Sequence, residues 1–161
     1  MKIADLKPND IVDVDKGICV SLWMQGCPFH CPGCHNPQTW DPQGGIGIDI
    51  NNLVRKIRDA ISANGIQRNF SVLGGEPLAP YNLENTAKII RYIRFIYPNI
   101  KIFLWTGYTL EKLNRNDKYI KSILNDINIL IDGPYLESKR DITLPLRGSS
   151  NQRILEKGKN F

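Results

Sequence analysis

Three cysteines share one short stretch of the chain, Cys27, Cys31 and Cys34, with the spacing C-x3-C-x2-C. Three thiolates so close in sequence can bind three irons of a four-iron cluster and leave the fourth iron without a protein ligand. An open metal position indicates chemistry rather than a purely structural site. Pro32 and Gly33 disfavour a continuous helix here, so we predict a loop wrapped around a metal centre.

A structural zinc site is the main alternative for these three cysteines. Cys19, His30 or His35 could complete it, because three cysteines and a histidine form a common zinc set. Zinc sites usually show paired C-x2-C spacings, and a single triplet favours the cluster. Cys19, the only other cysteine, lies in an apolar run, so we expect it to pack in the core.

The elements that must position this loop alternate between two periodicities. Apolar runs alternate with segments whose apolar residues recur at helical spacing, which predicts an α/β fold with a mostly parallel sheet and right-handed crossovers. Polar and glycine-rich residues follow each predicted strand, and ligands bind beyond the carboxyl ends of such strands. The predicted strands span 18–25, 69–73, 101–105 and 128–131, and the predicted helices span about 49–64, 83–97 and 117–126.

Composition and charge narrow the class of protein. The chain has 161 residues, 42% hydrophobic and 23% charged, so we expect one domain over 1–161 that becomes irregular from about residue 138. The net charge of +5 is spread along the chain, which favours a solvated basic surface over a nucleic-acid partner. No apolar run approaches the length of a membrane span, so we expect a cytoplasmic protein without a membrane partner.

The combination of C-x3-C-x2-C with Gly-Gly-Glu-Pro at the end of the next strand resembles the radical S-adenosylmethionine (SAM) enzymes. Their minimal core is a partial (β/α) barrel with a mostly parallel sheet. Within that superfamily, the chain resembles the activases of glycyl radical enzymes, and in particular the branch that acts on anaerobic ribonucleoside-triphosphate reductases. The segments that carry this resemblance are 26–36, 39–40, 74–78, 105–108, 131–133 and 147–152.

This resemblance implies two cofactors. Cys27, Cys31 and Cys34 would ligate a [4Fe-4S] cluster, and its open iron would chelate S-adenosyl-L-methionine, with no catalytic side chain beyond cluster and SAM. Two groups of residues would contact SAM: Gly33, Cys34 and His35 beside the cluster, and Gly74, Gly75 and Glu76 at the methionine amino group.

The resemblance also implies a reaction and its partners. Reductive cleavage of SAM would give a 5′-deoxyadenosyl radical, which would form a glycyl radical on the large catalytic subunit of the reductase. A small electron-donor protein such as flavodoxin would supply the electron.

Several alternatives remain open from the sequence. They are an activase of another glycyl radical enzyme, a small-molecule radical SAM enzyme, an iron–sulfur electron carrier and a zinc-binding interaction module. An electron carrier would be expected to have four clustered cysteines, and here only three are clustered. For the segment 147–153 the sequence offers no physical role, and docking of a partner is one hypothesis.

Overall fold

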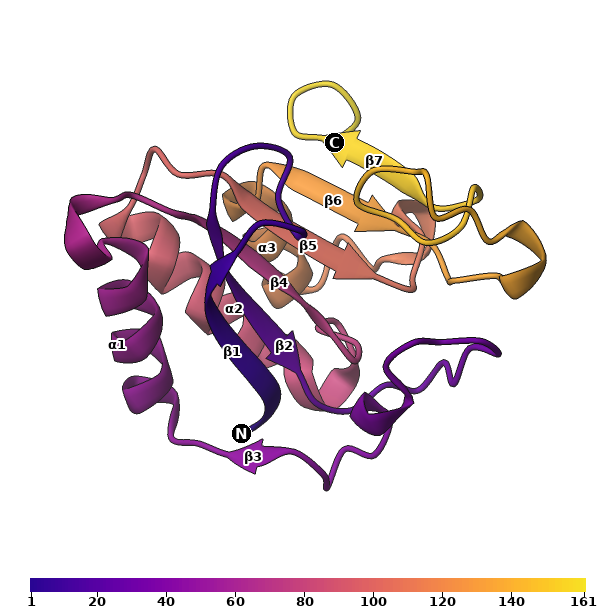
Figure 1. The fold of residues 1–161 in the computed structure, drawn as a ribbon, viewed down its shortest axis with the longest axis horizontal. Coiled ribbons are helices and arrows are strands. Elements are labelled where there is room, and N and C mark those ends of the chain that lie inside the picture. The colour runs from indigo at the N-terminus through magenta and orange to yellow at the C-terminus, as the bar shows by residue number, and fades with distance from the viewer.

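A twisted seven-stranded sheet forms the centre of the protein in a computed structural model that describes all residues, 1–161 (Figure 1). The strand order is β3-β1-β2-β4-β5-β6-β7, and the sheet does not close into a barrel. The strands are β1 (Lys2–Asp10), β2 (Cys19–Met24), β3 (Ile46–Gly47), β4 (Asn69–Gly74), β5 (Ile102–Thr106), β6 (Ile129–Asp132) and β7 (Arg153–Glu156).

The four strands in the middle of the sheet are parallel, as the sequence predicted. β2 pairs with β4, β4 with β5 and β5 with β6, all in the same direction. The prediction missed the antiparallel strands that flank them: β1 and β3 on one side, and β7 on the other. β7 lies within the region after residue 138 that was expected to be irregular, so that part of the prediction was wrong for 153–156.

Three helices cover one face of the sheet (Figure 1). Asp49 and Asp117 cap two of them by accepting hydrogen bonds from backbone N–H groups of the first turn, as their side chains favour. Apolar residues of the three helices pack with those of the strands in a core of 24 buried residues. The helices are α1 (Ile50–Ile61), α2 (Pro80–Ile96) and α3 (Lys118–Asp126).

No helix covers the opposite face of the sheet. Cys19, Phe103 and Ile131 point to this face and form a small second core with Val14, from the loop between β1 and β2. Leu146, from the segment before β7, packs against the same cluster. Loops alone therefore cover this face, and they leave room for a cavity beside the carboxyl ends of the parallel strands.

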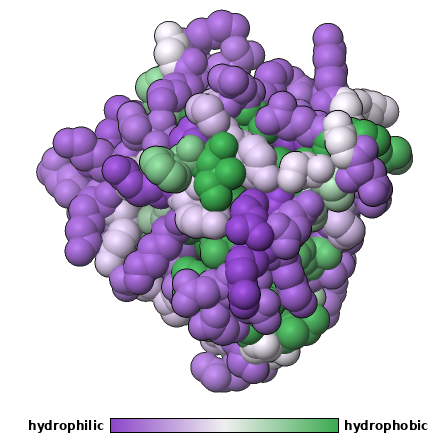
Figure 2. Space-filling view, turned by 90° about the vertical axis from the view of Figure 1, so that its left-hand side faces the viewer, coloured by the Kyte–Doolittle hydropathy of each residue, from purple (hydrophilic) through white to green (hydrophobic).

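The side of the molecule where α1 lies carries mostly hydrophilic residues, with apolar residues in small separate groups (Figure 2). This is the surface that an amphipathic helix presents to water when its apolar stripe faces the core. None of the helices is both long and apolar enough to span a membrane.

Candidate iron–sulfur and cofactor site

The cysteine loop begins directly after β2, at the carboxyl edge of the parallel strands (Figure 1). Gly26 makes the turn with a φ of +92°, a conformation that favours glycine. Its N–H donates to Thr39 O at 2.7 Å, and Cys27 N–H donates to Trp40 O at 3.0 Å. These bonds close the loop onto the short 3-10 helix Pro37–Thr39, so the loop has a fixed beginning and end.

The thiols of Cys27, Cys31 and Cys34 are free, half-buried and line one cavity of about 430 Å³. A cavity of this size is in the range of small-molecule and cofactor sites. It extends from the cysteine loop along the helix-free face of the sheet as far as Val12 and Asp13. The structure thus brings the three predicted ligands to one wall of one cavity.

Backbone N–H groups surround the cysteine sulfurs. Burial raises the pKa of the Cys27 thiol, and the amides of Phe29 and His30 oppose this rise. Burial likewise raises the pKa of Cys31, and the Tyr135 amide opposes it. Asn36 N–H donates to Cys34 Sγ at 3.4 Å. Amides directed at thiolate sulfur favour the charged form and are the hydrogen bonds that tune iron–sulfur clusters, so this loop fits a cluster.

The zinc alternative requires four ligands around one ion. No three His, Cys, Asp or Glu side chains are grouped closely enough to hold a single metal ion. His30 packs against Trp40, with ring centroids 4.9 Å apart, and His35 lies near Tyr135 at 6.3 Å. A four-iron cluster does not require the cysteines to meet around one ion, because each cysteine binds a different iron.

Cys19 is a core residue, as predicted. It is fully buried in β2, and its Sγ–H donates to Asp13 O at 3.5 Å. Burial raises the pKa of its thiol to about 12, so the neutral form is strongly favoured. It packs on the helix-free face near Val14 and does not line the cavity that the other three cysteines share.

Gly74, Gly75 and Glu76 follow β4 and lie directly beside the cysteine loop. Gly75 N–H donates to Met24 O at 2.8 Å, and Glu76 N–H donates to Gly26 O at 2.8 Å. The β2–β4 pairing therefore continues past both strands and joins the two predicted motifs. All three residues line the same cavity as the cysteines.

The Glu76 carboxylate is buried and is held by three donors. Its oxygens accept hydrogen bonds from Leu78 N–H at 2.8 Å, Thr106 Oγ1–H at 2.8 Å and Gly107 N–H at 2.7 Å. Burial raises its pKa to about 7, although the three hydrogen bonds oppose the rise. This side chain ties the end of β4 to the end of β5, so its carboxylate is engaged within the protein.

Gly33 and His35 lie where the cysteine loop meets the segment that follows β6. Gly33 has a φ of +75°, and the Glu137 carboxylate fills the space that a side chain at this position would need. Of the two, only His35 lines the cavity. Glycine at this position therefore allows the left-handed turn of the loop and leaves space for the Glu137 carboxylate.

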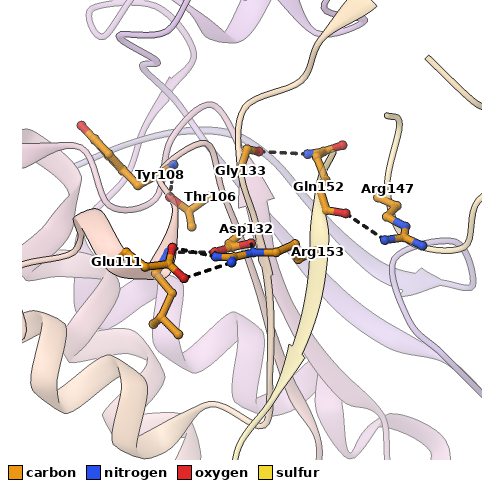
Figure 3. A network of polar contacts seen from close by, with 9 residues as sticks. Thr106, Tyr108, Glu111, Asp132, Gly133, Arg147, Gln152 and Arg153 are labelled. Atoms are coloured by element: carbon orange, nitrogen blue, oxygen red, sulfur yellow. Dashed lines mark hydrogen bonds and ion pairs between the residues drawn. The ribbon is translucent and has the colours of Figure 1, made fainter. Parts of the chain in front are cut away.

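Asp132, at the end of β6, belongs to an ion-pair network (Figure 3). The side chain is fully buried and accepts from Leu110 N–H at 2.7 Å and from Arg153 Nε–H at 2.8 Å. Arg153 also donates to both oxygens of Glu111. The network joins the β5–α3 loop, β6 and β7, and it accounts for Asp132 structurally.

Several residues that line the cavity were not predicted as site residues. Tyr135, Arg147 and Gln152 come from the segments before β7, and Asp13 comes from the loop after β1. Arg147 is the only lysine or arginine that lines the cavity. The match of 147–152 to the activase branch was the only sequence signal for Arg147 and Gln152, and Tyr135 and Asp13 had none, because all four lie in segments without periodicity.

In this small α/β protein, three cysteines lie on a loop at the carboxyl edge of parallel strands. This arrangement suits an iron–sulfur domain. In agreement, residues 15–155 match the family described as "4Fe-4S single cluster domain". The chain belongs to the family of the anaerobic ribonucleoside-triphosphate reductase-activating proteins.

Three relatives illustrate this membership, and each bears that name. The protein of Escherichia coli (strain K12) is 34% identical over 91% of this chain and 93% of its own length. The protein of Haemophilus influenzae is 31% identical over 91% of this chain and 92% of its own length. The protein of Enterobacteria phage T4 is 32% identical over 91% of this chain and 88% of its own length.

Proposed function

We propose that this protein activates the large catalytic subunit of an anaerobic ribonucleoside-triphosphate reductase. It would do so by reductive cleavage of S-adenosyl-L-methionine at a [4Fe-4S] cluster on Cys27, Cys31 and Cys34. A small electron-donor protein such as flavodoxin would reduce the cluster. Family membership supports this choice of partner, because the relatives are named as activating proteins of the anaerobic ribonucleoside-triphosphate reductase.

One observation supports the chemistry above all others. The cysteine loop and the Gly74–Glu76 segment are joined by the hydrogen bond from Glu76 N–H to Gly26 O, and both face one cavity. A metal loop alone would suit an electron carrier or a zinc module. The adjoining cavity provides a place for a second, small-molecule cofactor next to the metal loop.

The chain's own residues would bind and orient the cofactors. The three cysteine thiolates would hold three irons, and the Gly74–Glu76 backbone would receive the ammonium group of SAM. Arg147 offers the only lysine or arginine charge at the cavity, and its Nε–H is buried without a partner. We propose that it faces the carboxylate of SAM, since a guanidinium suits a carboxylate.

When bound, cluster and SAM together supply the 5′-deoxyadenosyl radical that takes a hydrogen atom from a glycine of the partner. The protein supplies no acid, base or nucleophile to this step. Its apolar walls, among them Trp23, Leu73 and Trp105, would keep water away from the reacting groups.

Anaerobic reconstitution tests the cofactors. The wild-type protein should bind close to four irons and four sulfides per chain, give a cluster signal in electron paramagnetic resonance (EPR) after dithionite, and convert SAM to methionine and 5′-deoxyadenosine. Cys31→Ala should abolish the cleavage, whereas Cys19→Ala, the matched control, should retain it. A colourless protein that binds one zinc ion, or a cluster with four protein ligands, would overturn the proposal.

A second experiment tests the partner. Reconstituted protein, SAM and reductant should produce a glycyl radical signal on the large reductase subunit. The same subunit without its glycine-containing C-terminal region should give no signal. Activation that survives this deletion would contradict the proposal even if SAM cleavage is confirmed.

A further inference from the structure

The segment that follows β6 lies against the cysteine loop. The Glu137 carboxylate sits beside Gly33, and the Tyr135 hydroxyl donates to that carboxylate. The Tyr135 ring lies 6.3 Å from the ring of His35 and lines the same cavity as Cys31. The Tyr135 amide opposes the rise that burial causes in the pKa of Cys31. One side of the predicted metal loop is thus formed by residues 133–137, which come from a distant part of the sequence.

Two amide side chains form hydrogen bonds to the backbone of the 133–137 segment. Asn151 Nδ2–H donates to Pro134 O at 2.7 Å. Gln152 Nε2–H donates to Gly133 O at 3.2 Å, a contact shown in Figure 3. A side chain on Gly148 would come within 3.3 Å of the Tyr135 ring, so this glycine lets the ring pack closely. The 148–152 segment therefore packs closely against the 133–137 segment, which in turn contacts the cysteine loop.

The segment that carries these amides is itself anchored. Gln152 Oε1 accepts from Gly148 N–H at 3.0 Å and from Ser149 N–H at 3.2 Å, and Arg147 donates to Gln152 O at 2.8 Å. Arg153 follows directly and is fixed to buried Asp132. A segment with this many internal bonds is suited to hold another segment in place.

We propose that Asn151 and Gln152 are positioning residues for the iron–sulfur cluster. They act through the 133–137 segment, which their hydrogen bonds keep in contact with the cysteine loop. This inference rests on the proposed function, because it assumes a cluster on the three cysteines. It also gives 147–152 a role within the molecule, where the sequence suggested partner docking as one hypothesis.

The reduction potential of the cluster should depend on the position of the 133–137 segment. Hydrogen bonds to cluster and cysteine sulfurs are among the determinants of that potential. An amide near Cys31 stabilises the more negative, reduced state of the cluster. Loosening the 133–137 segment should therefore shift the midpoint potential to a more negative value and open a path by which iron can leave.

Asn151→Ala is the cleanest test, because the Asn151 side chain makes only the bond to Pro134 O, and its Oδ1 has no partner. Ser150→Ala is the matched control, since Ser150 is exposed in the same segment and only its backbone is hydrogen-bonded. Both variants and the wild type are reconstituted anaerobically. The measurements are the iron content, the midpoint potential by EPR-monitored titration, and the rate of iron release to a chelator.

We expect all three proteins to bind the same amount of iron. Asn151→Ala should have a more negative midpoint potential and should release iron several-fold faster, whereas Ser150→Ala should match the wild type. If Asn151→Ala has the wild-type potential and release rate while the wild type cleaves SAM, the positioning role is wrong and the proposed function stands. A wild type that binds no [4Fe-4S] cluster would overturn both.

Discussion

Gly26 and Gly75 touch backbone to backbone at the junction of the two motifs. A Cβ on Gly75 would fall well inside van der Waals contact of Gly26 O, and the neighbouring Glu76 N–H donates to that same oxygen. Gly75 has no positive φ, so its lack of a side chain matters here for space alone. The relative position of the cysteine loop and the Gly74–Glu76 segment depends on this contact.

Substitution of this glycine should separate the two motifs. We expect Gly75→Ala to displace the Gly26 carbonyl, to reduce iron incorporation after reconstitution and to weaken SAM binding. Gly47→Ala is a suitable control, since a side chain there meets only the end of the Lys2 side chain at 3.9 Å. Equal iron content and equal SAM affinity in the two variants would show that the contact is dispensable.

Glu76→Gln tests the link between β4 and β5. At pH 8, above its pKa of about 7, Glu76 accepts from Leu78, Thr106 and Gly107. Glutamine would place an NH2 group against at least one of these donors in a buried site. A buried donor left without an acceptor costs about 1–3 kcal/mol, but the raised pKa means that the wild type itself loses stability as Glu76 ionises. Urea unfolding should therefore show a loss for Glu76→Gln that is larger at pH 5 than at pH 8.

Thr106→Val is the comparison for this measurement. It removes one donor to Glu76 and leaves the carboxylate with the amides of Leu78 and Gly107. The loss of stability should therefore be smaller than for Glu76→Gln. An equal or larger loss would mean that Thr106 stabilises the protein mainly through other contacts, such as the hydrogen bond that it accepts from Tyr108 N–H at 3.2 Å.

The sequence predicted the central part of this fold because local patterns determine it. The buried parallel strands appear as apolar runs, and Asp49 and Asp117 signal helix starts that the structure confirms. The strands at the two sides are harder to recognise. β1 is mostly exposed or half-buried and contains Pro8, and β7 has only four residues. Their pairing is decided by tertiary contacts that no short window contains.

The candidate site divides in the same way. The three cysteines and Gly74–Glu76 stand in compact motifs, and the structure places them on one cavity. Tyr135, Arg147 and Gln152 reach that cavity through irregular segments that are folded by side-chain hydrogen bonds to distant carbonyls. Such bonds leave no periodic trace in the sequence.

Arg153 should matter more for stability than its partly exposed position suggests. It neutralises Asp132, whose side chain is 0% exposed, while 42% of the Arg153 side chain is exposed. Removing one partner of a buried ion pair leaves an uncompensated charge, which costs about 3–5 kcal/mol when both partners are buried. For Arg153→Met we expect the lower end, about 3 kcal/mol, because water can reach part of the site.

Glu111→Gln provides the contrast. Arg153 holds the pKa of Glu111 down to about 2, but this carboxylate is exposed to water, which screens the interaction. Chemical denaturation should therefore show little change for Glu111→Gln and a large change for Arg153→Met. Similar losses for the two variants would mean that the buried and exposed parts of the network contribute equally.

Asp13 should make stability depend on pH. Burial, together with the nearby charge of Asp10, raises its pKa from 3.8 to about 7. Between these two values, the unfolded chain loses the Asp13 proton and the folded chain keeps it, so this residue's contribution to stability falls as the pH rises from about 4 to 7. Asparagine cannot ionise and removes this loss. Asp13→Asn should therefore raise the unfolding temperature relative to wild type at pH 8 and have much less effect at pH 4. Thermal unfolding of both proteins at the two pH values measures this difference, and a gain of equal size at both would show that the Asp13 charge is not its cause.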